Sequence, residues 1–156
     1  MSQPFRFDAK ALCREAAEFG AFRRPRQVRF HEIDAAGIVF FARVVDYVHD
    51  NYCEYLESVG HGLPAVLKAA EWAAPIGHVE VDYFEPLHFG DRLELVIAKA
   101  HIDGSRLALA HQICKSASGK VACVAQTVHV FVSRADLRPT SIPEALRREL
   151  QKLPQA

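Results

Sequence analysis

The segment VRFHEIDAAGIVFFARVVDYVHDNYCEYLESVG, residues 28–60, contains the two patterns that decide the fold of this chain. In its second half, polar residues recur every three or four positions from Arg43 to Val59, and apolar residues cover the opposite side. That spacing predicts one long amphipathic helix over 43–59. Gly60 follows where a left-handed C-terminal cap is expected, so the helix should end there.

The first half of the same segment alternates in polarity. Val28 and Phe30 are separated by polar residues in RQVRFHEID, which is typical of a half-buried strand over residues 26–34. The turn-prone sequence D-A-A-G follows, so the strand should end near Asp34. Asp34 is thereby placed on a loop between a strand and the long helix.

Upstream, residues 8–19 can form a short helix with Asp8 as its N-cap, and we expect Pro25 to break the pattern that follows. Downstream, Gly62 and Pro64 separate the long helix from a short helix over 65–71. The remaining pattern has a period of two and predicts strands over 79–83, 93–97, 107–113 and 121–132, with turns at Asp103-Gly104 and Ser118-Gly119. A last helix is expected over 143–152, capped by Ser141 or Thr140.

This order predicts a single domain over residues 1–156 in the α+β class. Strands joined by short turns are antiparallel, so one face of their sheet is free to pack on the long helix. We therefore expect an antiparallel sheet wrapped around one central helix. The helices at the two ends of the chain are expected to be extensions of a core that covers about residues 26–133.

Composition excludes several classes of function. The chain has 156 residues, half of them hydrophobic, and its 19 Lys and Arg balance its 19 Asp and Glu, which argues against a nucleic-acid partner. No apolar stretch reaches the roughly 20 residues of a membrane span, and no secretory signal is evident, so we expect a cytoplasmic protein without a membrane partner. The four scattered cysteines favour reduced thiols.

Sequence motifs for common catalytic centres are missing. The chain has neither a G-x-S-x-G nucleophile elbow nor a G-x-x-x-x-G-K-[ST] phosphate loop. Its eight histidines form no H-x-x-x-H or H-E-x-x-H spacing. We therefore expect no metal and no cofactor.

Both the element order and residues 28–60 resemble the 4-hydroxybenzoyl-CoA thioesterase family of hot-dog proteins. The family signature is an aspartate, two small residues, a glycine and an aromatic-rich stretch that enters the central helix, here D-A-A-G-I-V-F-F. This segment and PIGHVEVDYFEPLHFGDRLEL, residues 75–95, are most similar to the branch that acts on aromatic acyl-CoAs, including 1,4-dihydroxy-2-naphthoyl-CoA. The resemblance implies a hot-dog fold and an acyl-CoA thioesterase that hydrolyses an aromatic or bulky acyl-CoA.

The resemblance also implies roles for particular residues. Asp34 matches the catalytic carboxylate, and Gly37 matches a position that gives the thioester close access to the backbone. Phe41 matches the position whose backbone N–H binds the thioester oxygen. Related proteins often have His or Tyr there, so Phe41 departs from the family in its side chain but not in its backbone donor. The family further implies a homodimer or homotetramer with active sites at the subunit interface.

Elementary chemistry is compatible with these roles. The first N–H groups of a helix are unpaired and its N-terminus is positive, so the junction near Phe40 to Ala42 can stabilise an oxyanion. Asp34 could attack the carbonyl or activate a water, and the sequence does not distinguish the two routes. Without the resemblance, Asp34 would more often be an ordinary turn aspartate.

The neighbouring residues are weaker candidates. Ile38, Val39 and Phe40 could line an acyl pocket or simply fill the core. His31 could orient Asp34 or contact substrate, but alternation favours a position in solvent. Basic residues that could bind the phosphates of coenzyme A cannot be ranked from sequence: Lys115, Lys120, Arg134 and Arg138.

Two other functions stay open at this point. A hot-dog hydratase or dehydratase would need a histidine and a carboxylate across one site, and His31 with Asp34 is the only nearby pair. A non-catalytic module that binds acyl-CoA would retain a ligand without turning it over.

Overall fold

The structure is a computed structural model, and it describes residues 5–156. The elements follow one another in this order: α1 (Ala9–Arg14), β1 (Phe22–Gln27), η1 (Phe30–Glu32, a 3-10 helix), α2 (Arg43–Ser58), α3 (Leu63–Ala69), β2 (Trp72–Ala73), β3 (Ile76–Tyr83), β4 (Arg92–Asp103), β5 (Arg106–Lys115), β6 (Val121–Val130), β7 (Val132–Ser133) and α4 (Glu144–Leu150).

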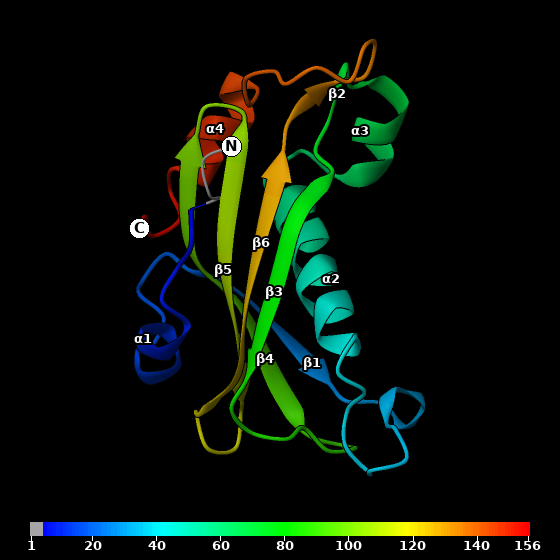
Figure 1. Ribbon diagram of the computed structural model, residues 1–156, viewed down its shortest axis with the longest axis vertical. Coiled ribbons are helices and arrows are strands. Elements are labelled where there is room, and N and C mark those ends of the chain that lie inside the picture. The colour runs from blue at the N-terminus through cyan, green and yellow to red at the C-terminus, as the bar shows by residue number, and fades with distance from the viewer. Residues whose placement is uncertain (1–4) are drawn as a thin grey trace.

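Five strands form one antiparallel sheet in the order β1-β4-β5-β6-β3. The long helix α2 runs along one face of this sheet, and α1 lies against the other face (Figure 1). A separate pair of short strands, β2 and β7, lies beyond the upper end of the sheet in this view. The expected α+β fold, an antiparallel sheet wrapped around one central helix, is confirmed.

The main core lies between α2 and the inner face of the sheet. Apolar residues of the helix at the predicted spacing, such as Val44, Val48 and Leu56, are buried against β4, β5 and β6. The last helix, α4, adds Leu146 and Leu150 to the same core at the other end of α2. The helix ends as expected, because Gly60 has a φ of 82° and the His61 N–H donates to the Leu56 carbonyl at 2.8 Å.

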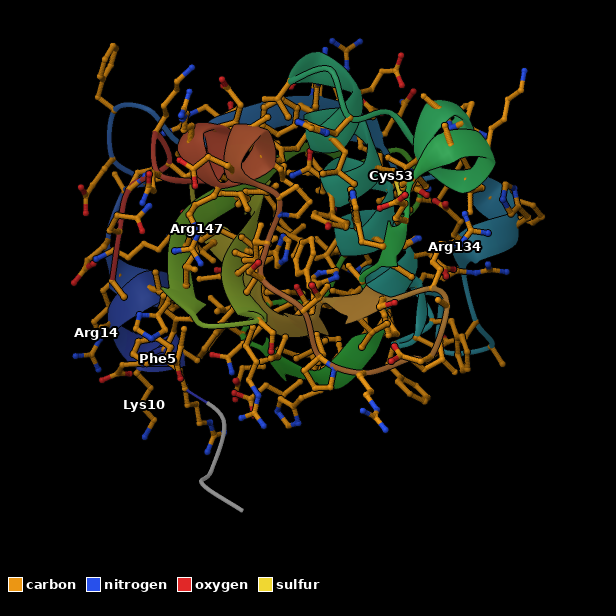
Figure 2. The ribbon with its side chains drawn as sticks, turned by 90° about the horizontal axis from the view of Figure 1, so that it is seen from above. Phe5, Lys10, Arg14, Cys53, Arg134 and Arg147 are labelled. Carbon is orange, nitrogen blue, oxygen red and sulfur yellow. The ribbon has the colours of Figure 1, made fainter. Side chains whose placement is uncertain are left out.

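The outer face of the sheet is covered by the N-terminal segment. Leu12 of α1 packs on apolar side chains of β4, β5 and β6. Two buried glutamines of the sheet hold this segment by its backbone: Gln112 donates to the Leu12 carbonyl at 2.6 Å, and Gln126 accepts from the Phe7 N–H at 2.7 Å. In the view from above, the charged side chains of Lys10 and Arg14 point away from the sheet (Figure 2).

The strand prediction for residues 26–34 is wrong. The strand lies earlier, at Phe22–Gln27, and residues Phe30–Glu32 form a 3-10 turn. Pro25 does not break the strand because β1 is an edge strand, paired within residues 5–156 with β4 alone, and an edge strand tolerates a residue without an N–H. The alternation of apolar and polar residues at 28–31 does not reflect a strand, since Val28 is fully buried whereas Phe30 is 77% exposed.

The ends of the short helices differ from the predicted ends by a few residues. Asp8 caps α1 as predicted, accepting from the Lys10 N–H at 2.9 Å, but the helix ends at Arg14, where the C-cap Glu15 has an extended backbone. The short helix predicted over 65–71 lies at Leu63–Ala69, with Pro64 in its first turn, where proline is accommodated. The predicted cap of α4 by Ser141 or Thr140 is wrong, since its N-cap is Pro143.

Strands β3 to β6 extend beyond the predicted apolar cores, and the short pair β2 and β7 was not predicted. Within residues 5–156, no helix is both long enough and apolar enough to cross a bilayer. The helix α2 has 16 residues but carries a charged face along its length.

Candidate active site

Residues 32–40 form a tight hairpin-like loop, here called the Asp34 hairpin. At its base, the Phe40 N–H donates to the Glu32 carbonyl at 2.9 Å, and Ile33 and Val39 form an antiparallel bridge. At its tip, the Asp34 N–H donates to the Ile38 carbonyl at 2.9 Å. Gly37 closes the tip with a φ of 78°, a backbone conformation that favours glycine. The D-A-A-G sequence is therefore the turn that fixes where Asp34 lies.

The Asp34 carboxylate is only partly engaged. Its Oδ1 accepts the Ala36 N–H at 2.7 Å, which orients the side chain across the turn. Within residues 5–156, no protein group donates to Oδ2. One oxygen of a half-buried carboxylate is therefore free for chemistry.

Asp34 opens onto a pocket of about 350 Å³. The walls are mainly apolar and come from the Asp34 hairpin, the start of α2, the end of β3 with the segment after it, and one residue of β6. They are lined by Asp34, Ile38, Val39, Phe41, Val44, Tyr83, Phe84, Glu85, Pro86, Leu87 and Cys123. The pocket therefore joins one free carboxylate oxygen to a surface that fits an apolar group.

The N-terminal end of α2 lies at the same pocket. Within residues 5–156, the N–H groups of Phe41 and Ala42, the two residues directly before α2, donate to no protein acceptor. The Phe41 carbonyl accepts a hydrogen bond from the Tyr83 hydroxyl at 2.7 Å. A bond from β3 thereby helps to fix the peptide groups at the helix start.

Cys123 is the nucleophilic side chain that the sequence did not connect with this site. It lines the pocket from β6 and is buried. Burial raises the pKa of its thiol to about 12, against a smaller lowering by Lys115, so the group is a neutral thiol at pH 7. Nucleophilic attack by a thiolate of Cys123 is therefore disfavoured.

A second carboxylate, Glu85, also lines the pocket. Unlike the free oxygen of Asp34, its Oε1 lies 3.4 Å from the ammonium group of Lys120. This pairing directs Glu85 toward a cation at the rim, so Lys120 is a basic candidate that lies beside the pocket. Lys115 pairs with Asp91 at 3.6 Å, and Arg134 donates to the Leu67 carbonyl at 2.9 Å.

The structure brings some of the predicted site residues together and leaves others apart. Asp34, Ile38, Val39 and Phe41 line one pocket. Gly37, Phe40 and His31 do not belong to its lining. Gly37 shapes the turn, the side chain of Phe40 is directed outward and 44% exposed, and His31 is exposed on the 3-10 turn.

Sequence reasoning missed the wall formed by the end of β3 and the segment that follows it. Tyr83, Phe84, Glu85 and Leu87 are more than 40 residues from Asp34 in the chain, and the Val39 N–H reaches the Leu87 carbonyl at 2.8 Å. No local period reports such a contact. The aromatic pair Tyr83-Phe84 followed by Pro86 was the only available signal.

The buried carboxylate of Glu32 was also missed. It is 3% exposed and pairs with Arg26, while the Tyr47 hydroxyl donates to it at 2.8 Å.

Within residues 5–156, no group of three or more His, Cys, Asp or Glu side chains is arranged to hold a metal ion. The reactive groups described at the pocket are the carboxylates of Asp34 and Glu85, the thiol of Cys123 and the N–H groups directly before α2.

Comparisons with known proteins identify the family of this chain. Residues 28–150 match the model of the thioesterase-like superfamily, and this match includes α4. A 1,4-dihydroxy-2-naphthoyl-CoA hydrolase of Gloeothece citriformis is 32% identical over 129 residues, covering 82% of this chain and 90% of that protein. The corresponding hydrolase of Synechocystis is 28% identical over 125 residues, covering 80% and 91%.

A solved structure gives the same result. The crystal structure of a 1,4-dihydroxy-2-naphthoyl-CoA thioesterase from Synechocystis superposes with a TM-score of 0.79 at 26% identity, covering 84% of this chain and 96% of that one. The hot-dog fold expected from the sequence is thereby confirmed. With its family model matched over most of its length, this chain belongs to the thioesterase-like superfamily and is an acyl-CoA thioester hydrolase.

Proposed function

We propose that this enzyme hydrolyses an aromatic acyl-CoA, with Asp34 as its catalytic carboxylate and the Phe41 N–H as its oxyanion donor. One observation carries the proposal: the free oxygen of Asp34 and the unpaired N–H groups at the start of α2 border the same apolar pocket. Thioester hydrolysis needs both an attacking group and stabilisation of a developing oxyanion.

The start of α2 supplies the electrostatic part of the proposed mechanism. The Phe41 N–H donates to the thioester carbonyl oxygen as negative charge develops there, and the positive end of the helix adds to the effect. Removal of a donor of this kind typically reduces kcat by about 10²- to 10³-fold. Because the donor is a backbone group, phenylalanine at this position does not weaken it.

Asp34 supplies the attacking group by one of two routes. Its free oxygen attacks the carbonyl carbon to form a mixed anhydride that water then hydrolyses, or it takes a proton from a water that attacks directly. In both routes the carbon–sulfur bond breaks and coenzyme A leaves as a thiolate. Both routes need the ionised carboxylate, so both are lost in an Asp34→Asn variant.

The substrate class follows from the pocket and from the relatives. The pocket walls combine Ile38, Phe41 and Leu87, which favour a planar apolar acyl group over a charged one. The two relatives described above are named for a bicyclic aromatic acyl-CoA. We therefore place this chain among the thioesterases for bulky aromatic substrates, and we expect a cytoplasmic location.

We further propose that the enzyme works as a homodimer paired through β3. This strand is at one edge of the sheet, so its outer backbone groups are available to a second strand. It also carries exposed apolar side chains, namely Ile76, Val79 and Tyr83. The other edge is less suited to pairing because β1 contains Pro25.

The first experiment is a spectroscopic assay of the purified protein against a panel of aromatic and aliphatic acyl-CoAs. Two matched variants accompany Asp34→Asn: Asp46→Asn, on the exposed side of α2, and Glu85→Gln, the second carboxylate of the pocket. We expect turnover of an aromatic member, a loss of at least about 100-fold in Asp34→Asn, or roughly 2.7 kcal/mol, and near-normal activity in Asp46→Asn.

Other outcomes would redirect the proposal. A loss confined to Glu85→Gln would transfer the catalytic role from Asp34 to Glu85. A tightly retained acyl-CoA without turnover would favour the binding module. The hydratase alternative has lost its basis, because the His31 that it required is exposed outside the pocket, and hydration of an enoyl-CoA would be needed to revive it.

A further inference from the structure

The carboxylate of Glu32 is the most densely bonded side chain near the site, although it does not touch the pocket. Its Oε1 accepts from the Arg26 guanidinium at 2.5 Å, and its Oε2 accepts from the Arg29 N–H at 2.7 Å and the Tyr47 hydroxyl at 2.8 Å. These partners belong to β1, the turn before η1, and α2. One buried group therefore ties three separate parts of the chain together.

The same residue is the base of the Asp34 hairpin. The Glu32 carbonyl accepts the Phe40 N–H at 2.9 Å, so its backbone is paired with the residue that directly precedes Phe41. Two residues further along the chain is Asp34. Any shift of Glu32 is thus transmitted to both halves of the proposed catalytic centre by short lengths of paired backbone.

We propose that Glu32 is a positioning residue: its carboxylate fixes the base of the Asp34 hairpin against β1 and α2, so that Asp34 and the Phe41 N–H face the pocket together. The inference rests on the proposed function, since it assigns Glu32 a part in the geometry of that site. It accounts for a buried charge at a place where an apolar side chain would fill space equally well. Buried ion pairs by themselves add little to stability, so a positional role explains this one better.

Electrostatics support a permanently charged anchor. Burial raises the pKa of Glu32, but the hydrogen bonds from Arg29, Arg26 and Tyr47 outweigh it and hold the pKa below the ordinary value. The Arg26 guanidinium also lies over the Tyr47 ring, 4.1 Å from its centroid, and pairs with Asp50 at 3.2 Å. The anchor is therefore ionised and fully bonded under the conditions of catalysis.

The test compares Glu32→Gln, which keeps the shape but removes the charge, with Leu12→Ala, which destabilises the opposite face of the sheet. Each variant is assayed for kcat and KM on the best aromatic acyl-CoA and for thermal stability. A displaced catalytic group lowers kcat without weakening ground-state binding, and a misplacement of about 1 Å can cost 100-fold. We expect kcat of Glu32→Gln to fall about 10- to 100-fold with KM within about 3-fold, and kcat of Leu12→Ala to stay unchanged.

Equal kcat values for Glu32→Gln and Leu12→Ala would overturn the positioning role, as would a loss that appears only in KM. If Glu32→Gln does not fold, Tyr47→Phe decides, because it removes one of the three donors and leaves the charge paired. A lowered kcat in folded Tyr47→Phe supports the proposal, and an unchanged kcat overturns it. Failure of the function itself looks different, since wild type would then hydrolyse no member of the panel.

Discussion

Replacing Leu12 by alanine tests whether the N-terminal segment is an integral part of the fold. Leu12 is 4% exposed and packs from α1 onto the outer face of the sheet. Truncation of a buried leucine costs about 2–5 kcal/mol, with the lower values where the surroundings can close the cavity. Since α1 has only six residues and lies at the edge of the molecule, we expect about 2–3 kcal/mol.

The assay is thermal unfolding followed by circular dichroism, with urea unfolding as a second measure. For a chain of this length, each kcal/mol shifts Tm by about 2–4 °C, so the expected loss is about 4–12 °C. The matched control is Lys10→Ala on the exposed side of the same helix, which we expect to change stability by less than about 0.5 kcal/mol. A shift for Leu12→Ala no larger than that of the control would refute the reasoning, because the segment would then not belong to the cooperative unit.

Three further predictions concern the site and the sheet edge. The lowered pKa of Glu32 contributes folding stability that is present above its unfolded pKa of about 4.3 and is lost as pH falls toward the lower folded pKa. Urea unfolding between pH 3 and 7 should therefore show a loss of stability at acid pH that Glu32→Gln lacks. Tyr83→Phe removes the hydrogen bond to the Phe41 carbonyl. Because such a bond contributes about 0.5–1.5 kcal/mol, we expect kcat/KM to decrease about 2- to 12-fold. An unchanged kcat/KM would show that this bond does not support the start of α2. Val79→Lys should convert the proposed dimer to a monomer in analytical ultracentrifugation by placing like charges at the paired edges, whereas Leu137→Lys, on a distant loop, should leave it intact.

The central helix and the outline of the sheet could be predicted because they depend on local periods. The apolar positions between Arg43 and Val59 share one side of a helix wherever that helix packs, and the structure has it at Arg43–Ser58. The turn at Asp103-Gly104 likewise joins β4 to β5, with Gly104 at a φ of 56°. Asp34 could be selected because a family signature surrounds it, although turn chemistry alone would have left it an ordinary loop residue.

The first strand shows where a local pattern failed. Val28 and Phe30 are both apolar and are two residues apart, yet Val28 is buried and Phe30 is exposed. The difference arises because the chain leaves the sheet after Gln27 and turns at η1, so the two side chains no longer share a face. Pro25 misled in the same way, since its acceptability depends on whether its strand is at an edge, which no short segment records.

By itself, the sequence determined the long helix, the antiparallel strands and a carboxylate on the loop that enters the helix. Only the tertiary structure decided what surrounds that carboxylate. It brought Tyr83 at the end of β3 and Leu87 after it to the pocket, and it buried Glu32 between Arg26 and Tyr47. The physical reason is that helices and turns are stabilised by neighbours in the chain, whereas a pocket and a buried ion pair are made by residues that meet only after the sheet has closed around the helix.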